Sequence, residues 1–364
     1  MRFATEYRDA GLGKRLIERI HRRSTRPVRL MEFCGGHTAT IVRYGLRQLV
    51  PPTIEMLSGP GCPVCVTASA DLDKAIYLAQ LPDVIITTFG DMLKVPGSYS
   101  SLQQAKAEGG DIRIVYSTQD ALDIARNNPA KSVIFLGIGF ETTAPTVAAS
   151  VLEAVQEGIG NYYVLSLHKL CPPVIKALLD SGEVRLDGII CPGHVSAVIG
   201  SLPYHFIPAD YGIACAISGF EPLDVLLGID MLVTQIEKKQ PEVVIAYRRG
   251  VNVEGNRRAL EVMEQVFEPC AANWRGMGII PESGLKLRQE YGGFAAERAF
   301  QIEIEPPREP EGCLCGDILR GVKTPLDCRL FRRECRPEHP VGPCMVSSEG
   351  SCSIYYLYGG SYGG

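Results

Sequence analysis

Short apolar runs that end in glycine-rich or charged loops recur along the first two thirds of the chain. The first third contains VRLMEFCGGH, TIEMLSGPGCPVC, VIITTFGD and IRIVYS, and the second contains SVIFLGIGFETT, YYVLSLHK, GIICPGHVS and GIACAISGF. Helix-length stretches lie between the runs; residues 68–80, for example, have apolar side chains on one helical face, at Leu72, Ala75, Ile76 and Ala79. Buried strands that alternate with helices are typical of parallel α/β units, so the pattern predicts an α/β fold.

The runs predict two similar open parallel-sheet α/β domains, at about residues 25–125 and 126–238, each with about four buried strands. Residues 243–270 predict one more strand and an amphipathic helix. Residues 1–24 together with 239–364 form the predicted third domain, in which the cysteine-rich tail from about Gly312 is expected to form a smaller, ligand-held unit. Ligands of open parallel sheets bind outside the carboxyl ends of the strands, where these motifs lie, so we expect both sheet edges to face one cleft.

Composition argues against a disulfide framework. A chain of 364 residues with 46% hydrophobic content buries a core without covalent staples, and an odd count of 13 cysteines cannot pair completely. The N-terminal segment is polar and Arg-rich, and no stretch is apolar for long enough to span a bilayer, which favours a soluble protein in the reducing cytoplasm without membrane contact. A net charge of −4 without a basic and aromatic stripe gives no indication of nucleic-acid binding.

The cysteines of the tail have the strongest spacing signal. Four of them follow the pattern C-x14-C-x6-C-x16-C, namely Cys313, Cys328, Cys335 and Cys352, with Cys315 and Cys344 as spare candidates. Thiolates are soft ligands, and a loop-rich segment can wrap around a cluster. Zinc is the alternative, but the wide gaps lack the CxxC pairs of zinc ribbons, so the spacing favours a [4Fe–4S] cluster.

Two cysteine motifs near the N-terminus indicate reactive thiols. In Cys34-Gly-Gly-His37-Thr, the paired glycines bring a thiol and an imidazole into an open site, where a lowered thiol pKa would suit a nucleophile or an iron ligand. The alternative is a buried cysteine at a strand end beside a capping His-Thr. In Gly-Cys62-Pro-Val-Cys65, the two thiols are spaced to form a redox disulfide or to bind a metal as two of its ligands. The alternative is a structural turn in which the cysteines have no chemical role.

Other strand-end loops contribute weaker candidates. The GFETT run carries a carboxylate and two hydroxyls at a strand-to-helix junction, where backbone amides favour anions. The alternative is that the run only caps the helix, through one of its two threonines. Single histidines in such loops are more often hydrogen-bonded than catalytic. The candidates are Asp91, Glu141, Thr142, Thr143, His168, Lys169, His194 and Ser196, whereas we expect Cys171, Cys191, Cys215 and Cys270 to be buried and unreactive.

The whole set of motifs closely resembles the HypD family of hydrogenase maturation factors. CGGHT, GPGCPVC, GFETT, PGHVS and the tail GVKTPLDCRLFRREC…GPCMVSSEGSC occur in the family's order over essentially the whole chain. One departure is Ala39, where the family pattern CGGHTH has a second histidine.

The resemblance implies two related α/β domains, a third domain with a [4Fe–4S] cluster, and a scaffold that assembles the Fe(CN)2CO unit of [NiFe]-hydrogenase rather than an enzyme with a free product. It implies that the protein forms a complex with the chaperone HypC and receives cyanide from HypE, which is charged by HypF. The hydrogenase large subunit is implied as an indirect partner. By motif, Cys34 binds the Fe(II) being assembled, shared with the chaperone's N-terminal cysteine, and His37 lies beside it. Cys62 and Cys65 become a thiol–disulfide pair that exchanges electrons with the cluster.

Two other classes of protein remain open. A stand-alone thiol–disulfide or iron–sulfur electron-transfer oxidoreductase would use Cys62 and Cys65 with a generic reductant. A nucleotide-dependent enzyme has little support, because GxxxxGK[ST] does not occur and GxGxxG is not met at Gly137-Ile138-Gly139.

Overall fold

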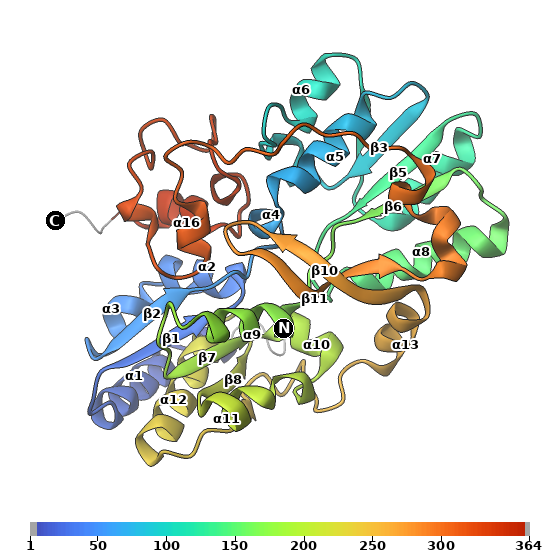
Figure 1. The fold of residues 1–364 in the computed structure, drawn as a ribbon. Coiled ribbons are helices and arrows are strands. Elements are labelled where there is room, and N and C mark those ends of the chain that lie inside the picture. Colours follow the sequence, from blue (N-terminus) through green and yellow to red (C-terminus); the bar gives the residue numbers. More distant parts are fainter. Residues whose placement is uncertain (1–5, 361–364) are drawn as a thin grey trace.

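The computed structural model describes residues 6–360 and has an α/β fold with two parallel sheets (Figure 1). The first sheet has the strand order β2-β1-β7-β8-β9, with bounds β1 (Val28–Glu32), β2 (Ile54–Ser58), β7 (Gly188–Pro192), β8 (Ala214–Ser218) and β9 (Val243–Ile245). The second has the order β4-β3-β5-β6, with bounds β3 (Val84–Thr88), β4 (Asp111–Ile114), β5 (Ser132–Gly137) and β6 (Tyr162–Ser166). The predicted fold class is confirmed.

The two sheets do not correspond to the domains predicted at residues 25–125 and 126–238. The chain starts the first sheet with β1 and β2, builds the second sheet, and then returns, so that β1 pairs with β7 in the register Met31↔Ile189. The apolar runs of both sheets look alike, and a run does not specify its partner strand, which is why the sequence suggests two consecutive domains instead of two interleaved ones.

Helices cover both sheets. Helix α5 (Ser69–Ala79) coincides with the predicted helix at 68–80, and its predicted apolar face is buried. Helix α7 (Thr118–Asn127) begins with a capping box of Ser117 and Asp120. The other helices before the tail are η1 (Glu6–Arg8), α1 (Ala10–Arg23), α2 (Gly35–Arg43), α3 (Leu46–Leu49), α4 (Pro63–Val66), η2 (Gly90–Lys94), α6 (Leu102–Ala107), α7 (Thr118–Asn127), α8 (Ala144–Glu157), α9 (Cys171–Ser181), α10 (Gly193–Ile199), η3 (Leu202–Tyr204), α11 (Phe206–Tyr211) and α12 (Pro222–Lys238).

The last third adds a long antiparallel hairpin and a loop-rich tail. The strand and amphipathic helix predicted within residues 243–270 are present as β9 and α13 (Arg257–Val266). In the hairpin, the buried Trp274 donates its indole N–H to Ser283 Oγ at 2.7 Å. The elements of this part are β10 (Phe267–Trp274), β11 (Gly278–Leu287), η4 (Gln289–Phe294), α14 (Ala296–Ala299), α15 (Cys315–Leu319), η5 (Pro325–Asp327), η6 (Pro343–Met345) and α16 (Ser351–Tyr358).

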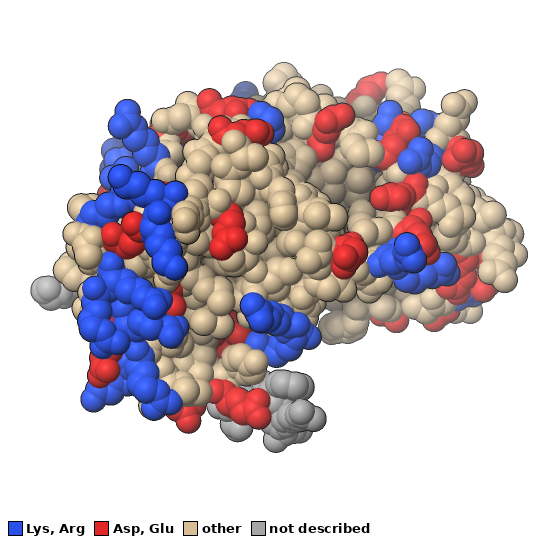
Figure 2. Space-filling view, turned by 90° about the horizontal axis from the view of Figure 1, so that it is seen from below, with Lys and Arg blue, Asp and Glu red and all other residues tan. Residues whose placement is uncertain are grey.

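The N-terminal helix packs on the first sheet's layer and not on the tail with which the sequence groups it. Helix α1 contacts α12, and its Ile20 is buried in the same core as Leu30 of β1. Figure 2 shows Lys and Arg side chains gathered on the left of the molecule, the side on which α1 lies in Figure 1. Arg19 and Arg23 of α1 make ion pairs with Asp230 of α12, at 2.7 and 3.1 Å. These two arginines therefore help to hold α1 against α12. Within residues 6–360, no helix combines the length and apolar character needed to cross a membrane.

The interleaved sheets predict different behaviour for two fragments of similar size. A fragment of residues 67–170 contains every strand of the second sheet, whereas residues 25–125 contain two strands from each sheet and lack β5 and β7. We expect the first fragment to unfold cooperatively in urea, followed by circular dichroism, and the second to change gradually, because its strands lack their central partners. Cooperative unfolding of 25–125 alone would contradict this pairing.

Candidate functional site

A cavity of about 410 Å³ lies where the carboxyl ends of the two sheets meet. Loops that follow strands of both sheets line it, together with one loop of the tail. It brings together Cys34, Thr142, Thr143 and His194 among the predicted site residues, together with Asp91. Pro63, Val64, Ser347 and Glu349 also line it. The two sheet edges therefore face one cavity.

Cys34 lies between β1 and α2, where its backbone N–H donates to Glu32 Oε2 at 2.9 Å. Burial raises the pKa of the Cys34 thiol well above its ordinary value, and the carboxyl groups of Glu349 and Glu32 raise it further. The expected lowering of this pKa is wrong, because burial outweighs the position at a helix N-terminus. Burial likewise raises the pKa of Glu32 to about 8, although the Thr38 hydroxyl donates to it.

Two glycines of the cysteine motifs allow the loops to close around Cys34. A Cβ on Gly61 would lie 2.2 Å from the Cys34 backbone nitrogen, and a Cβ on Gly35 would lie 2.2 Å from the Glu349 carbonyl oxygen. The Gly35 N–H donates to the Gly61 carbonyl at 3.2 Å. A larger residue at position 61 would push the loop after β2 away from Cys34, and a larger residue at position 35 would push the tail away from the start of α2.

His37 and Ser196 are not at the cavity surface. The His37 ring is fully buried, with Nε2 at 3.0 Å from the Gly219 carbonyl oxygen and 3.2 Å from that of Ser218. Burial lowers the pKa of His37 to about 4, so the ring is neutral, and contact with two acceptors places its proton on Nε2. Ser196 is buried within α10 and donates to the Pro192 carbonyl at 2.7 Å.

The GFETT loop places its three polar side chains differently. Glu141 is buried, its Oε1 accepts the Cys171 N–H at 2.9 Å, and its Oε2 has no hydrogen-bond partner among the described residues. Burial raises the pKa of Glu141 to about 7. Thr142 and Thr143 line the cavity, and the Thr143 hydroxyl donates to the carbonyls of Ile138 and Phe140 instead of capping α8.

Cys62 and Cys65 are joined by a disulfide that is almost fully buried. Cys62 Sγ accepts the Cys65 N–H at 3.2 Å at the start of α4. Pro63 and Val64 of the same turn line the cavity on one side, and α4 contacts α15 and η6 of the tail on the other. The disulfide therefore lies between the cavity and the tail.

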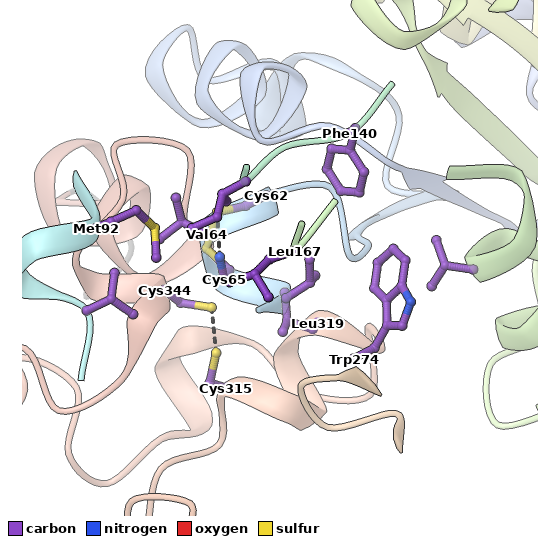
Figure 3. Packing of buried hydrophobic residues seen from close by; sticks show 14 of the residues in the cluster. Cys62, Val64, Cys65, Met92, Phe140, Leu167, Trp274, Cys315, Leu319 and Cys344 are labelled. Carbon is purple, nitrogen blue, oxygen red and sulfur yellow. Dashed lines mark hydrogen bonds between the residues drawn. A yellow bond between two sulfur atoms is a disulfide. The ribbon is translucent and has the colours of Figure 1, made fainter. Parts of the chain in front are cut away.

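All six cysteines of the tail line one small, mainly apolar interior space, alongside Ile318, Leu330, Phe331 and Met345. Figure 3 shows one pair of them, Cys315 and Cys344, beside the Cys62–Cys65 disulfide; the two Sγ atoms of the pair are 2.7 Å apart. Burial raises the pKa of Cys313 to about 12. In the part of the chain that is described, no three His, Cys, Asp or Glu side chains are arranged to hold a single metal ion.

The remaining candidates do not line the cavity. His168 and Lys169 are buried away from the cavity, and Lys169 Nζ lies 3.4 Å from Asp71 Oδ2. Cys171, Cys191 and Cys215 are buried as expected, whereas Cys270 is only half-buried, which corrects that prediction.

Three residues of this site are not among the candidates predicted from the sequence: Glu32, Phe220 and Glu349. Glu32 lies two residues before Cys34, within an apolar run, and this position could have drawn attention to it. Glu349 and Phe220 reach the site from distant segments, and nothing in their spacing points to it.

Glu141 predicts a pH dependence of stability. The folded protein has a Glu141 pKa of about 7, against an ordinary value of 4.5. The unfolded chain releases this proton first, so the free energy of unfolding falls as the pH rises between these values and then levels off. We expect Glu141→Gln to weaken the fall in urea midpoint from about pH 5 to about pH 8, and exposed Glu254→Gln to leave it unchanged. An undiminished fall in the Glu141 variant would contradict this assignment.

Comparisons with known proteins agree with this arrangement of motifs. Residues 12–359 match the family model described as HypD: Hydrogenase formation hypA family. The hydrogenase maturation factor HypD of Rhodobacter capsulatus is 46% identical over 373 residues, with 99% of each chain covered. That of Cupriavidus necator is 45% identical over 370 residues, with 99% of this chain and 97% of the relative covered. A putative hydrogenase expression/formation protein of Methanocaldococcus jannaschii is 42% identical over 352 residues, with 96% and 98% covered. The chain therefore belongs to the HypD family of hydrogenase maturation factors.

Proposed function

We propose that the chain is the scaffold on which the Fe(CN)2CO unit of [NiFe]-hydrogenase is assembled before transfer toward the hydrogenase large subunit. It works in complex with HypC and takes cyanide from HypE, which HypF charges. The observation that carries the proposal is the order of thiols: Cys34 at the cavity, the buried Cys62–Cys65 disulfide behind it, and the tail thiols beyond. The free thiols of the chain suit a reducing compartment, so we propose the cytoplasm as its location.

Cys34 is suited to hold Fe(II) as cargo and to release it again. Its raised pKa keeps the thiol protonated in the absence of metal, and binding of iron displaces that proton. When a proton returns to the Cys34 thiol, the metal is released. In the complex, a cysteine of the chaperone would be the second ligand of the iron. Asp91 and His194 line the same cavity and carry an oxygen and a nitrogen donor, although the three side chains are not arranged as a metal site in this structure.

The dithiol form of Cys62 and Cys65 would release cyanide by reduction. A thiocyanate R–S–C≡N and two cysteine thiols give R–SH, cyanide, one proton and the cysteine disulfide, so the two electrons and all atoms balance. The structure holds this pair in the disulfide form, directly behind Pro63 and Val64 of the cavity wall. Cyanide released there would form next to the iron that captures it.

The donor set of the tail fits a [4Fe–4S] cluster, because soft thiols surround one mainly apolar space. We propose Cys313, Cys328, Cys335 and Cys352 as its ligands, which leaves Cys315 and Cys344 as a dithiol between these ligands and the disulfide. When bound, the cluster would supply electrons one at a time.

A stand-alone thiol oxidoreductase is less well supported. A stand-alone enzyme would exchange with disulfide substrates at the protein surface, whereas Cys62 and Cys65 are 4% and 0% exposed and lie behind the cavity wall, where only a small group that enters the cavity comes near them. Electrons would have to enter from within the protein or from the cavity.

The iron-binding role of Cys34 is tested by infrared spectroscopy. The chain is co-expressed with its maturation partners and isolated without oxygen, and we expect metal-bound cyanide and carbonyl bands in the complex. Cys34→Ala should abolish the bands, because the assembled iron loses its ligand, and Cys270→Ser, outside the cavity, should keep them. Full bands in the Cys34 variant would overturn the assignment.

The cluster assignment is tested by iron and sulfide analysis after anaerobic purification. Cys328→Ser and Cys335→Ser should each lose most iron and sulfide, because a cubane cluster needs all four thiolates. Cys315→Ser, in the same interior space but outside the proposed ligand set, should retain them. Unchanged iron in the first two variants, or its loss in the third, would require a different ligand set.

A further inference from the structure

Three aromatic rings from separate elements form a continuous stack beside the cavity. The Phe220 ring follows β8 and lies between the imidazoles of His37 in α2 and His194 in α10. Its centroid is 4.7 Å from that of His37, with an interplanar angle of 17°, and 3.9 Å from that of His194, with an angle of 30°. Only His194 of the three lines the cavity.

The inner part of the stack is fixed on several sides. His37 is fully buried, with Nε2 facing the carbonyls of Ser218 and Gly219, two residues of the chain just before Phe220. The Phe220 carbonyl accepts the Thr40 hydroxyl at 2.5 Å, so α2 holds both the ring and the backbone of this segment. Gly36 leaves room for the phenyl ring, since a Cβ there would lie 2.8 Å from Phe220 Cδ1.

The outer ring, in contrast, has no polar anchor within residues 6–360. His194 is exposed, and no hydrogen bond or ion pair to its imidazole is formed among the described residues. The stack against Phe220 is therefore the contact that orients this ring toward the cavity. An imidazole without that support would be free to rotate about its side-chain torsions.

We propose that Phe220 and His37 are positioning residues that together hold His194 in the assembly cavity, with His37 acting through the phenyl ring and not on the cargo. This inference rests on the proposed function of the cavity. It explains how a histidine of the CGGHT motif can matter for the site while its ring is buried behind it. It also assigns a task to Phe220, which ends the apolar run GIACAISGF but is not among the candidate site residues predicted from the sequence.

Nuclear magnetic resonance of histidine-labelled protein tests the positioning directly. The chain has six histidines, and a His194→Gln variant identifies the signal of interest by its loss. A ring stacked on a phenyl face has upfield-shifted ring protons, so Phe220→Leu should move the His194 signal downfield, while Phe220→Tyr should retain the shift. His37→Leu should also move it, although His37 does not stack on His194. Phe206→Leu, which removes a half-buried ring outside the stack, should leave it in place.

Infrared analysis of the same variants in complex with their partners tests the consequence. We expect Phe220→Leu to reduce the bound cyanide and carbonyl bands by roughly tenfold or more, with recovery in Phe220→Tyr, as misplacement of a site group commonly does. An unmoved His194 signal in the folded Phe220→Leu or His37→Leu variant would overturn the inference. The inference would also be overturned if Phe220→Leu moved the His194 signal but left the cyanide and carbonyl bands at full intensity. Absence of bands from wild-type protein that shows the shifted His194 signal would instead reject the proposed function.

Discussion

The pairing of β1 with β7 is the constraint on which the site depends. It joins the beginning of the chain to a strand more than 150 residues later and encloses the whole second sheet between them. Because parallel strands end at the same edge, the loop that carries Cys34 and the loop that carries His194 become neighbours. The second sheet then presents Asp91 and the GFETT loop from the opposite side. Two consecutive domains would have separated these loops.

Burial decides the protonation of the site more strongly than helix ends or neighbouring cations do. Cys34, Glu32 and Glu141 all have raised pKa values with burial as the largest cause, and burial lowers the pKa of His37. Removal from water disfavours the charged form of every one of these groups. In and around the cavity, burial therefore favours the neutral form of each of these groups, and the proposed binding of a metal cation by Cys34 would have to displace the thiol proton.

Sequence predicts the local parts of this molecule well and the distant ones poorly. The α/β class, α5 and the positions of motifs at strand ends follow from periodicity and glycine-rich loops. Strand pairing does not, since buried parallel strands are nearly interchangeable apolar runs. The same limit hides Phe220 and Glu349, which reach the site only through tertiary packing. It also makes His37 look like a cavity residue, because spacing in a loop does not determine which face of α2 is buried.

The tail connects the proposed cluster ligands to the shape of the cavity. Ser347 and Glu349 line the cavity and lie between Cys344 and Cys352, which face the interior space on the other side. The close approach of Glu349 to Gly35 seals this loop against the start of α2. A segment with so little regular structure relies on side-chain anchors for its path, so whatever the tail thiols bind also fixes one wall of the cavity. The proposed iron assembly would thus depend on the tail through packing as well as through the proposed electron transfer.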